Sequence, residues 1–367
     1  MSACAPAGTL LGQTTEYVDT YRPDLLTPIP RSLGRDAIGV HDFRGTDVWR
    51  LYEITWINER GLPVAAAGEI RVRHTAIGVN YVDIYHRDGL YPLPVWPSPL
   101  GVEAAGWVEA LGPGVSHLHI GQRVAYAGPP VGSYSSARNL PAWLALPLPD
   151  AVADAAAASL LLRGITAHML FTRVYRLQAG DILLVHAAAG GLGLVLTQWA
   201  KTLGARVIGT VSSAAKAALA RRYGLDHAVL RHEGNFADAV LTLTAGQGVD
   251  YAIDGIGGDT LAATLGVVRP YGMVASVGQV AGDPGPLPLS LLGPARSVAL
   301  ARPGVFRYLS DPARYQEGGL ATLAQLAGGL TLPVDSEFAL ADAAQAHRRL
   351  QSGQSAGAIL LHPDSQP

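Results

Sequence analysis

The second half of the chain alternates short apolar runs with stretches of helical spacing. Apolar runs at Asp181–His186, Arg206–Val211 and Tyr251–Asp254 have the length of buried strands. Leu194–Leu203 and Ala214–Tyr223, which follow the first two runs, place apolar residues at helical intervals. Buried strands that alternate with helices in this way predict an α/β fold with a doubly wound parallel sheet.

The first part of the chain has a different pattern, in which short β-type runs are broken by Gly and Pro from about residue 37 to residue 149. The strand candidates are Val48–Trp56, Glu69–Ile77 and Gly106–Ala110. Short runs with frequent turn residues predict a largely β domain.

These two patterns divide the chain into four predicted segments. Residues 1–36 are a flexible N-terminal extension or, alternatively, an arm that docks a partner. Residues 37–163 are the β-rich domain, and residues 164–299 are the doubly wound domain. We expect residues 300–367 to return to the first domain, because the short strand candidate Ala358–Leu361 needs an existing sheet to pair with.

Composition narrows the functional class. The chain has 367 residues, a formal net charge of −2 and one Cys. Near-neutral charge argues against a nucleic-acid or anionic-membrane partner. A single Cys forms no internal disulfide, which makes a reducing, cytoplasmic setting the expectation. We expect no membrane span, since the apolar stretch Ala151–Leu162 is interrupted by Asp154 as in a buried helix.

A glycine-rich turn joins the first predicted strand of the doubly wound domain to its helix. It reads His-Ala-Ala-Ala-Gly-Gly-Leu-Gly from His186 to Gly193, so that Ala188 stands at the first Gly of the G-x-G-x-x-G pattern. The alternative is a purely structural turn. Strand before and helix after favour a dinucleotide pyrophosphate held by Gly190, Gly191, Leu192 and Gly193.

The end of the next strand distinguishes the two nicotinamide dinucleotides. No Asp or Glu stands at Gly209–Ser213, where an NAD enzyme binds the ribose 2′-OH. Ser212, Lys216 and Arg231 offer donors for a 2′-phosphate instead. We therefore expect NADPH, the alternative being that Lys216 only solvates an exposed helix.

Ligands for a metal are missing from the expected positions. Val102 occupies the place where zinc alcohol dehydrogenases have a His ligand, and Cys4 lies in the extension. His117 and His119 share a Gly-rich turn that has no third ligand nearby. We predict no metal site, which favours acceptors that need no Lewis acid, such as quinones and conjugated enones. Glu103, beside Val102, is interpreted as structural, the alternative being that it orients the cleft backbone.

Several separated stretches together resemble the zinc-independent, zeta-crystallin-like quinone oxidoreductases of the medium-chain dehydrogenase/reductase superfamily. The resemblance runs from about Ala37 to Pro363 and is carried by residues 76–85, 88–92, 101–106, 132–135, 163–167, 190–201 and 301–303. It implies a GroES-like catalytic domain with an inserted Rossmann domain, and a homodimer.

The resemblance also implies roles for individual residues. Asn80 and Tyr85 would lie beside the nicotinamide, with Tyr91 and Tyr134 near the entrance for the quinone. Other residues would contact the cofactor, namely Thr166, Gly278 and Gln279 around the nicotinamide and Arg302, for which a solvated or interface position is the alternative. Asn80 is alternatively a turn cap, and Tyr85 and Tyr91 are alternatively half-buried packing residues.

Two positions depart from the family pattern. Arg231 stands where relatives often have Tyr, and Gly353 stands where relatives often have an Arg that reaches the adenosine phosphate. A charge lost at position 353 is regained at position 231 in this interpretation.

The predicted function is NADPH-dependent reduction of quinones, with transfer from nicotinamide C4 in an interdomain cleft without metal. One alternative is reduction of α,β-unsaturated carbonyls or enoyl thioesters. A second alternative is a non-catalytic NADPH-binding protein, crystallin-like or RNA-binding, although the acidic charge balance weighs against RNA.

Overall fold

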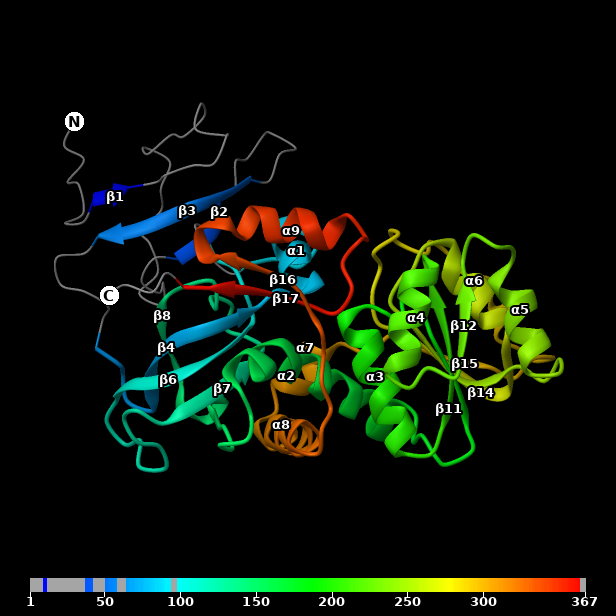
Figure 1. Cartoon of the computed structure of the whole chain (residues 1–367), viewed down its shortest axis with the longest axis horizontal. Helices are drawn as coiled ribbons and strands as arrows, with labels where there is room; N and C mark the ends of the chain where they lie inside the picture. The colour runs from blue at the N-terminus through cyan, green and yellow to red at the C-terminus, as the bar shows by residue number, and fades with distance from the viewer. Residues whose placement is uncertain (1–8, 12–36, 42–49, 58–63, 94–97, 364–367) are drawn as a thin grey trace. The chain divides into compact units, whose positions relative to one another are not determined.

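The computed structural model describes residues 9–11, 37–41, 50–57, 64–93 and 98–363, and it divides into two compact units (Figure 1). The first unit is Met1–Leu162 with Val334–Pro367, and the second is Arg163–Pro333. The second unit is thus an insertion in the first.

The second unit contains a six-stranded parallel sheet. Its strand order is β12-β11-β10-β13-β14-β15. In chain order the strands are β10 (Ile182–Val185), β11 (Arg206–Val211), β12 (His227–Leu230), β13 (Val249–Asp254), β14 (Val268–Ser276) and β15 (Ala299–Ala301). From β10 the chain adds strands first on one side, to β12, and then on the other side, beginning with β13. This change of side is a topological switch point, where such sheets bind ligands beyond the carboxyl ends of the strands.

Helices cover both faces of this sheet (Figure 1). Those that connect its strands are α3 (Gly191–Thr202), α4 (Ala214–Arg222), α5 (Phe236–Leu243), α6 (Asp259–Gly266) and the 3₁₀ turn Leu289–Leu291. Two more helices, α7 (Val305–Leu309) and α8 (Pro312–Ala327), follow β15. The unit begins within α2 (Asp154–Met169), which continues as a π-helical turn, Leu170–Val174.

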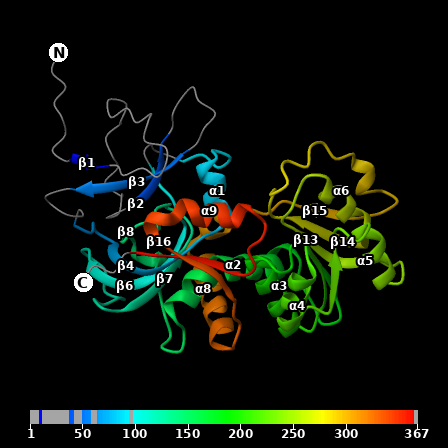
Figure 2. The ribbon, with the colours of Figure 1, turned by 45° about the horizontal axis from the view of Figure 1, so that its top comes forward.

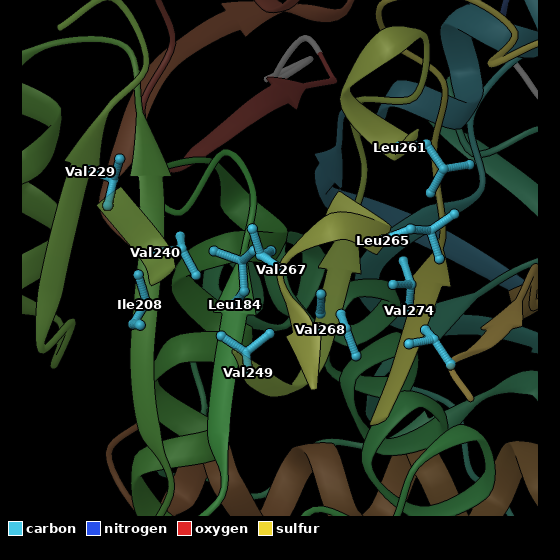
Figure 3. Close-up of a cluster of buried hydrophobic side chains, with 12 residues drawn as sticks. Leu184, Ile208, Val229, Val240, Val249, Leu261, Leu265, Val267, Val268 and Val274 are labelled. Carbon is cyan, nitrogen blue, oxygen red and sulfur yellow. The ribbon is translucent and has the colours of Figure 1, made fainter. Parts of the chain in front are cut away.

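Branched aliphatic side chains form a hydrophobic core on one side of this sheet (Figure 3). Leu184 and Ile208 come from neighbouring strands, and Leu261 and Leu265 come from α6. Val, Ile and Leu on strands buried on both faces are the composition expected of a parallel sheet. This core holds the strand ends, and the loops that follow them, in fixed positions.

The first unit is built mainly on antiparallel pairing, with one parallel pair formed by its last two strands. Its seven-stranded sheet has the order β16-β17-β4-β6-β7-β9, with β8 paired to β4. The strands are β4 (Glu69–Gly78), β6 (Glu103–Leu111), β7 (Arg123–Ala127), β8 (Ala137–Pro141), β9 (Leu146–Pro147), β16 (Val334–Ala339) and β17 (Ala358–His362). A second sheet joins β1 (Thr9–Leu11), β3 (Arg50–Ile57), β2 (Ala37–His41) and β5 (Ser98–Pro99).

Two helices of the first unit are important for the site. Helix α1 (Tyr81–Arg87) follows β4 directly, and α9 (Ala343–Gln351) lies against β16 and β17 (Figure 2). Short 3₁₀ turns are found at Ala142–Leu144 and Leu340–Asp342. Pairing of β17 with β4 places Leu361 beside Ile77, which connects the C-terminal stretch to the strand that leads into α1.

The chain returns to the first unit later than position 300, where the sequence analysis placed it. Residues 299–301 are β15, which pairs with β14, so this segment completes the parallel sheet. The return comes at β16, from Val334. The short strand β17 (Ala358–His362) does pair within the seven-stranded sheet of the first unit, between β16 and β4.

The predicted extension 1–36 lies outside the described residues, apart from Thr9–Leu11, which pairs with β3. Cys4 also lies outside them. Within the described residues, the stretch Asp154–Val174 is long and apolar enough to span a membrane, but 83% of its most apolar window is buried in the structure. Such burial is typical of a core helix.

Candidate functional site

The glycine-rich turn lies at the carboxyl end of β10 and begins α3. Gly190 is the N-cap, and the helix starts at Gly191, so its first backbone N–H groups point out of the helix end. A Cβ at Gly193 would lie 2.4 Å from the carbonyl oxygen of Ala187, a clash that only Gly avoids. The backbone N–H groups of such a glycine-built helix N-terminus are suited to an anion, and the backbone packs closely against the turn.

Ala188 fits this turn because of a second glycine on the next strand. A Cβ at Gly209 would lie only 2.4 Å from the Cβ of Ala188. The N–H of Ala188 donates to the carbonyl oxygen of Thr210 at 3.0 Å, which ties the turn to β11. Gly209 therefore provides the room for a side chain at the position where the usual pattern has glycine.

The predicted 2′-phosphate residues gather at the carboxyl ends of β11 and β12. Val211 and Leu230 are paired in register, so Ser212 and Arg231, which follow them, leave neighbouring strands at the same edge. Lys216 is in the first turn of α4, where its backbone N–H donates to the N-cap hydroxyl of Ser213 at 3.2 Å. Ser212 and Arg231 are exposed.

The ends of β13 and β14 form the adjoining part of this edge. A Cβ at Gly278 would lie 2.6 Å from the carbonyl oxygen of Gly255, so the two loops approach closely at a glycine. The Arg302 guanidinium donates to the amide oxygen of Gln279. Thr166 lies in α2 and is half-buried.

Asp254 stabilises the loop that follows β13. Its Oδ1 accepts from the N–H groups of Ile256 at 2.7 Å and Gly257 at 3.1 Å. Burial raises the pKa of this carboxyl above its ordinary value, against the lowering effect of the two N–H donors. The sequence analysis gave this residue no role.

In the first unit, Asn80 occupies the N-cap position of α1 and is 6% exposed. Its backbone N–H donates to Asp83 Oδ2 at 2.8 Å, and its side-chain Nδ2 donates to Glu103 Oε2 at 2.8 Å. Asn80 is therefore the N-cap of α1, and its side-chain amide is also held by a hydrogen bond to Glu103.

Three tyrosine rings form a cluster along α1 and the turn after it. The ring centroids of Tyr81 and Tyr85 are 5.7 Å apart, and those of Tyr85 and Tyr91 are 5.3 Å apart. The N–H of Tyr91 donates to the carbonyl oxygen of Tyr85 at 3.1 Å, which holds the turn. Tyr91 is 42% exposed, so the cluster presents an aromatic surface to solvent.

Tyr134, predicted to lie near the entrance for the quinone, is an interior residue of the first unit. It is fully buried, and its hydroxyl donates to Asp83 Oδ2 at 3.1 Å. His347 Nε2 lies 2.9 Å from the same hydroxyl, while its Nδ1 is 3.4 Å from Arg87 Nη1. In the described unit Tyr134 is thus a buried support for α1, and no part of an open entrance.

Hydrogen bonding around His347 is consistent with a neutral ring. Burial, followed by the charge of Arg87, lowers the pKa of His347 to about 3. Since Tyr134 donates to Asp83, the Nε2–H of His347 is the donor to the tyrosine oxygen and Nδ1 accepts from Arg87. This series of hydrogen bonds ends at the N-terminus of α1, where Asp83 also accepts from the N–H of Asn80.

Three residues that shape these two regions, namely Asp83, Gly209 and His347, were not predicted from the sequence as site residues, and Glu103 was interpreted there as structural. Only Asp83 carried a local signal, since it lies three residues after the N-cap Asn80, as in a capping box. Among the described residues, no group of three or more His, Cys, Asp or Glu side chains is placed to bind a metal ion.

A GroES-type unit of antiparallel strands, interrupted by a Rossmann-type unit with a phosphate-binding turn, defines a medium-chain dehydrogenase/reductase. Models of protein families agree with this class. The alcohol dehydrogenase GroES-like domain matches residues 66–150, and the zinc-binding dehydrogenase model matches residues 191–323. These two matches confirm the predicted fold class.

The most informative relatives are quinone and haloacrylate reductases. Quinone oxidoreductase 1 of Escherichia coli K12 is 36% identical over 330 residues, which cover 89% of this chain and 99% of that protein. A 2-haloacrylate reductase of Burkholderia sp. is 40% identical over 305 residues, 81% of this chain and 92% of that protein. The chain belongs to the quinone oxidoreductase family of the medium-chain dehydrogenase/reductases.

A solved structure agrees with the sequence comparison. Escherichia coli quinone oxidoreductase complexed with NADPH superposes with a TM-score of 0.82 at 35% identity, covering 89% of this chain and 99% of that one. The resemblance identified from the sequence is therefore confirmed.

A third family model matches the N-terminal part of the chain. The model of the N-terminal part of nitrile reductase, or 7-cyano-7-deazaguanine reductase, matches residues 17–80 and overlaps the start of the GroES-like match. Its range includes β2, β3 and β4, and of the predicted site residues it includes only Asn80. The sequence analysis did not detect this similarity.

Proposed function

We propose that this protein reduces quinones with NADPH. The observation that carries the proposal is the edge of the parallel sheet, where a glycine-built helix N-terminus is followed by Ser212, Lys216 and Arg231 at the neighbouring strand ends. A pyrophosphate suits the free N–H groups of α3, and a 2′-phosphate suits a cation-bearing edge with no carboxylate at the end of β11. The E. coli relative crystallised with NADPH supports the same cofactor.

In this proposal the second unit binds the cofactor. Gly190, Gly191, Leu192 and Gly193 hold the pyrophosphate, and Ser212, Lys216 and Arg231 hold the 2′-phosphate. Thr166, Gly278, Gln279 and Arg302 form the nicotinamide end, where the Arg302 guanidinium fixes the orientation of the Gln279 amide.

The first unit provides the residues for the acceptor. NADPH, when bound, supplies a hydride from its nicotinamide ring. Asn80 provides an amide beside that ring, and the rings of Tyr85 and Tyr91 offer a flat aromatic surface for a planar quinone. Tyr134 supports α1 from the interior and makes no contact with the acceptor. The protein positions the reactants and excludes water, and the quinone oxygens take their protons from solvent or a tyrosine hydroxyl.

The test is steady-state oxidation of NADPH by the purified chain with 1,4-benzoquinone. Turnover that saturates in both reactants is expected. A chain that binds NADPH tightly but oxidises it with no acceptor would instead support the non-catalytic alternative. Absence of NADPH binding by calorimetry would refute both.

Reduction of α,β-unsaturated acids or carbonyls is a second candidate. It is favoured by the 40% identity to a 2-haloacrylate reductase, which spans 92% of that relative. The same cofactor edge and aromatic surface serve either acceptor. A parallel assay with 2-chloroacrylate and an enone distinguishes the two, because turnover with these acceptors and none with benzoquinone would establish the second function.

We further propose that the activity is independent of zinc, and that the protein is a cytoplasmic homodimer. Zinc independence is supported by the chemistry of position 102, where Val has no metal-ligating atom, beside the buried Glu103. Activity that survives dialysis against a chelator, with no zinc bound stoichiometrically, is expected. Sedimentation equilibrium measures the oligomeric state.

A further inference from the structure

Glu103 is a buried carboxylate with two different hydrogen-bond donors. It is the first residue of β6 and is fully buried. Its Oε2 accepts from Asn80 Nδ2 at 2.8 Å, and its Oε1 accepts from the backbone N–H of Leu162 in α2 at 2.6 Å. Its own N–H donates to the buried hydroxyl of Ser133 at 3.1 Å. A charge is stable in the interior only when it is hydrogen-bonded in this way.

The fold makes room for this carboxylate at Gly78. A Cβ at Gly78 would lie 2.8 Å from Glu103 Oε2 and 2.0 Å from the carbonyl oxygen of Ala158. Strand β4 therefore approaches α2 closely only because it carries no side chain there. As a result, the Glu103 carboxylate lies against the backbone of Gly78, the last residue of β4, two residues before Asn80.

The two donors determine which chemical group fits at position 103. An ionised carboxylate accepts at both oxygens and donates at neither. A carboxamide of the same shape has one oxygen, so one of the two donors would face an NH₂ group. The carboxylate also orients the Asn80 amide, because Nδ2 points toward Glu103, which directs Oδ1 toward the N-terminus of α1. There the capping box pairs it with the backbone N–H of Asp83, which uses one of the two lone pairs of this oxygen. The backbone N–H of Asp83 donates to the backbone oxygen of Asn80 at 3.0 Å.

We propose that Glu103 is a positioning residue that fixes the Asn80 amide, so that Asn80 Oδ1 is presented as a hydrogen-bond acceptor to the nicotinamide half of NADPH. This inference rests on the proposed function. It gives Glu103 a role in cofactor binding without contact to the cofactor, since the effect passes through Asn80.

Exchanging the carboxylate of position 103 and the carboxamide of position 80 tests whether the orientation of the group at position 80, and not only its packing, affects NADPH binding. Glu103→Gln leaves one donor unsatisfied and allows the Asn80 amide to turn over. The double change Asn80→Asp with Glu103→Gln restores both hydrogen bonds, because the new carboxamide accepts from Leu162 and donates to the new carboxylate at position 80. That carboxylate still offers an acceptor oxygen where Oδ1 was, and the net charge of the pair is unchanged.

The measurement is the NADPH dissociation constant by fluorescence titration, with thermal unfolding recorded for each variant. Glu103→Gln is expected to weaken NADPH binding by about two- to tenfold, which is the usual effect of losing a hydrogen bond between neutral groups. The double variant is expected to recover most of this loss. The matched control is Glu109→Gln on the same strand, whose carboxylate pairs with the half-exposed Arg73, and it should leave the dissociation constant unchanged.

Two results would overturn the inference. If wild-type protein binds NADPH and Glu103→Gln binds it equally well, Glu103 does not orient the amide, while the proposed function stands. If the double variant is as stable as wild type but binds as weakly as Glu103→Gln, the loss does not come from the direction of the amide. Should Glu103→Gln not fold, the double variant alone decides, because recovered folding with wild-type affinity supports the exchange and folding without affinity refutes it. Failure of the wild type to bind NADPH would instead refute the proposed function, and this inference with it.

Discussion

Acid should destabilise this protein through His347, and the effect can be calculated from its surroundings. The ring is fully buried beside Tyr134, and burial followed by the charge of Arg87 lowers its pKa from 6.5 to about 3. In the unfolded chain the same residue takes up a proton near its ordinary pKa of about 6.5. Between pH 6.5 and pH 3 the unfolded state therefore binds one proton more than the folded state, so stability falls as pH falls.

The magnitude follows from the difference between the two pKa values. Between pH 7 and pH 5, uptake of this proton by the unfolded state lowers the free energy of unfolding by about 2 kcal/mol. His347→Gln removes the titration while retaining an amide donor near Tyr134. The variant is expected to be less stable at pH 7, because it loses the packing of the ring, but to lose about 2 kcal/mol less than wild type over this pH range.

The assay is urea unfolding at pH 7, 6 and 5, with the difference between wild type and variant as the measured quantity. The control is His232→Gln, in an exposed turn, which should leave the pH dependence of wild type unaltered. Parallel curves for wild type and His347→Gln would refute the reasoning, since they would mean that His347 titrates alike in the folded and unfolded states.

Three further predictions test other parts of the structure. Lys216→Ala should weaken NADPH binding about tenfold while changing NADH binding little, as a lost charge-assisted hydrogen bond requires; equal losses in fluorescence titrations with the two cofactors would show that Lys216 does not contact the phosphate. Gly209→Ala should lower the free energy of unfolding by about 1–3 kcal/mol, because its Cβ would lie 2.4 Å from that of Ala188 and 2.8 Å from Leu225 Cδ1. Ala188→Gly added to it should restore part of the stability in urea unfolding, since the contact with Leu225 remains; no recovery at all would mean that the contact with Ala188 is not a source of the strain. Tyr134→Phe should cost about 1–3 kcal/mol of stability by removing the hydroxyl between Asp83 and His347, with NADPH affinity unchanged; a stable variant with lost affinity would return Tyr134 to the cofactor site.

The parallel sheet was predictable from the sequence because its central strands, β10, β11 and β13, are mostly buried apolar runs. Arg206–Val211 was predicted with the bounds that the structure has, and Asp181–His186 and Tyr251–Asp254 differ from β10 and β13 by one or two residues. Strand β15 was missed because three residues, Ala299–Ala301, give no periodic signal. Its assignment depends on pairing with β14, which is a tertiary contact that the local pattern does not contain.

The candidate site was predictable to different extents in the two units, for a physical reason. A phosphate cradle depends on backbone geometry over a few consecutive residues, so the turn from Gly190 to Gly193 has a local sequence signature. The hydrogen bonds of Asn80 depend on partners at positions 83, 103 and, through Tyr134, 347, which only the folded sheet brings together. Glu103 is an example. Its position beside Val102 gave it only a structural interpretation from the sequence. In the fold, its two carboxylate oxygens accept from Asn80 Nδ2 and from the N–H of Leu162, two donors that its neighbouring sequence does not indicate.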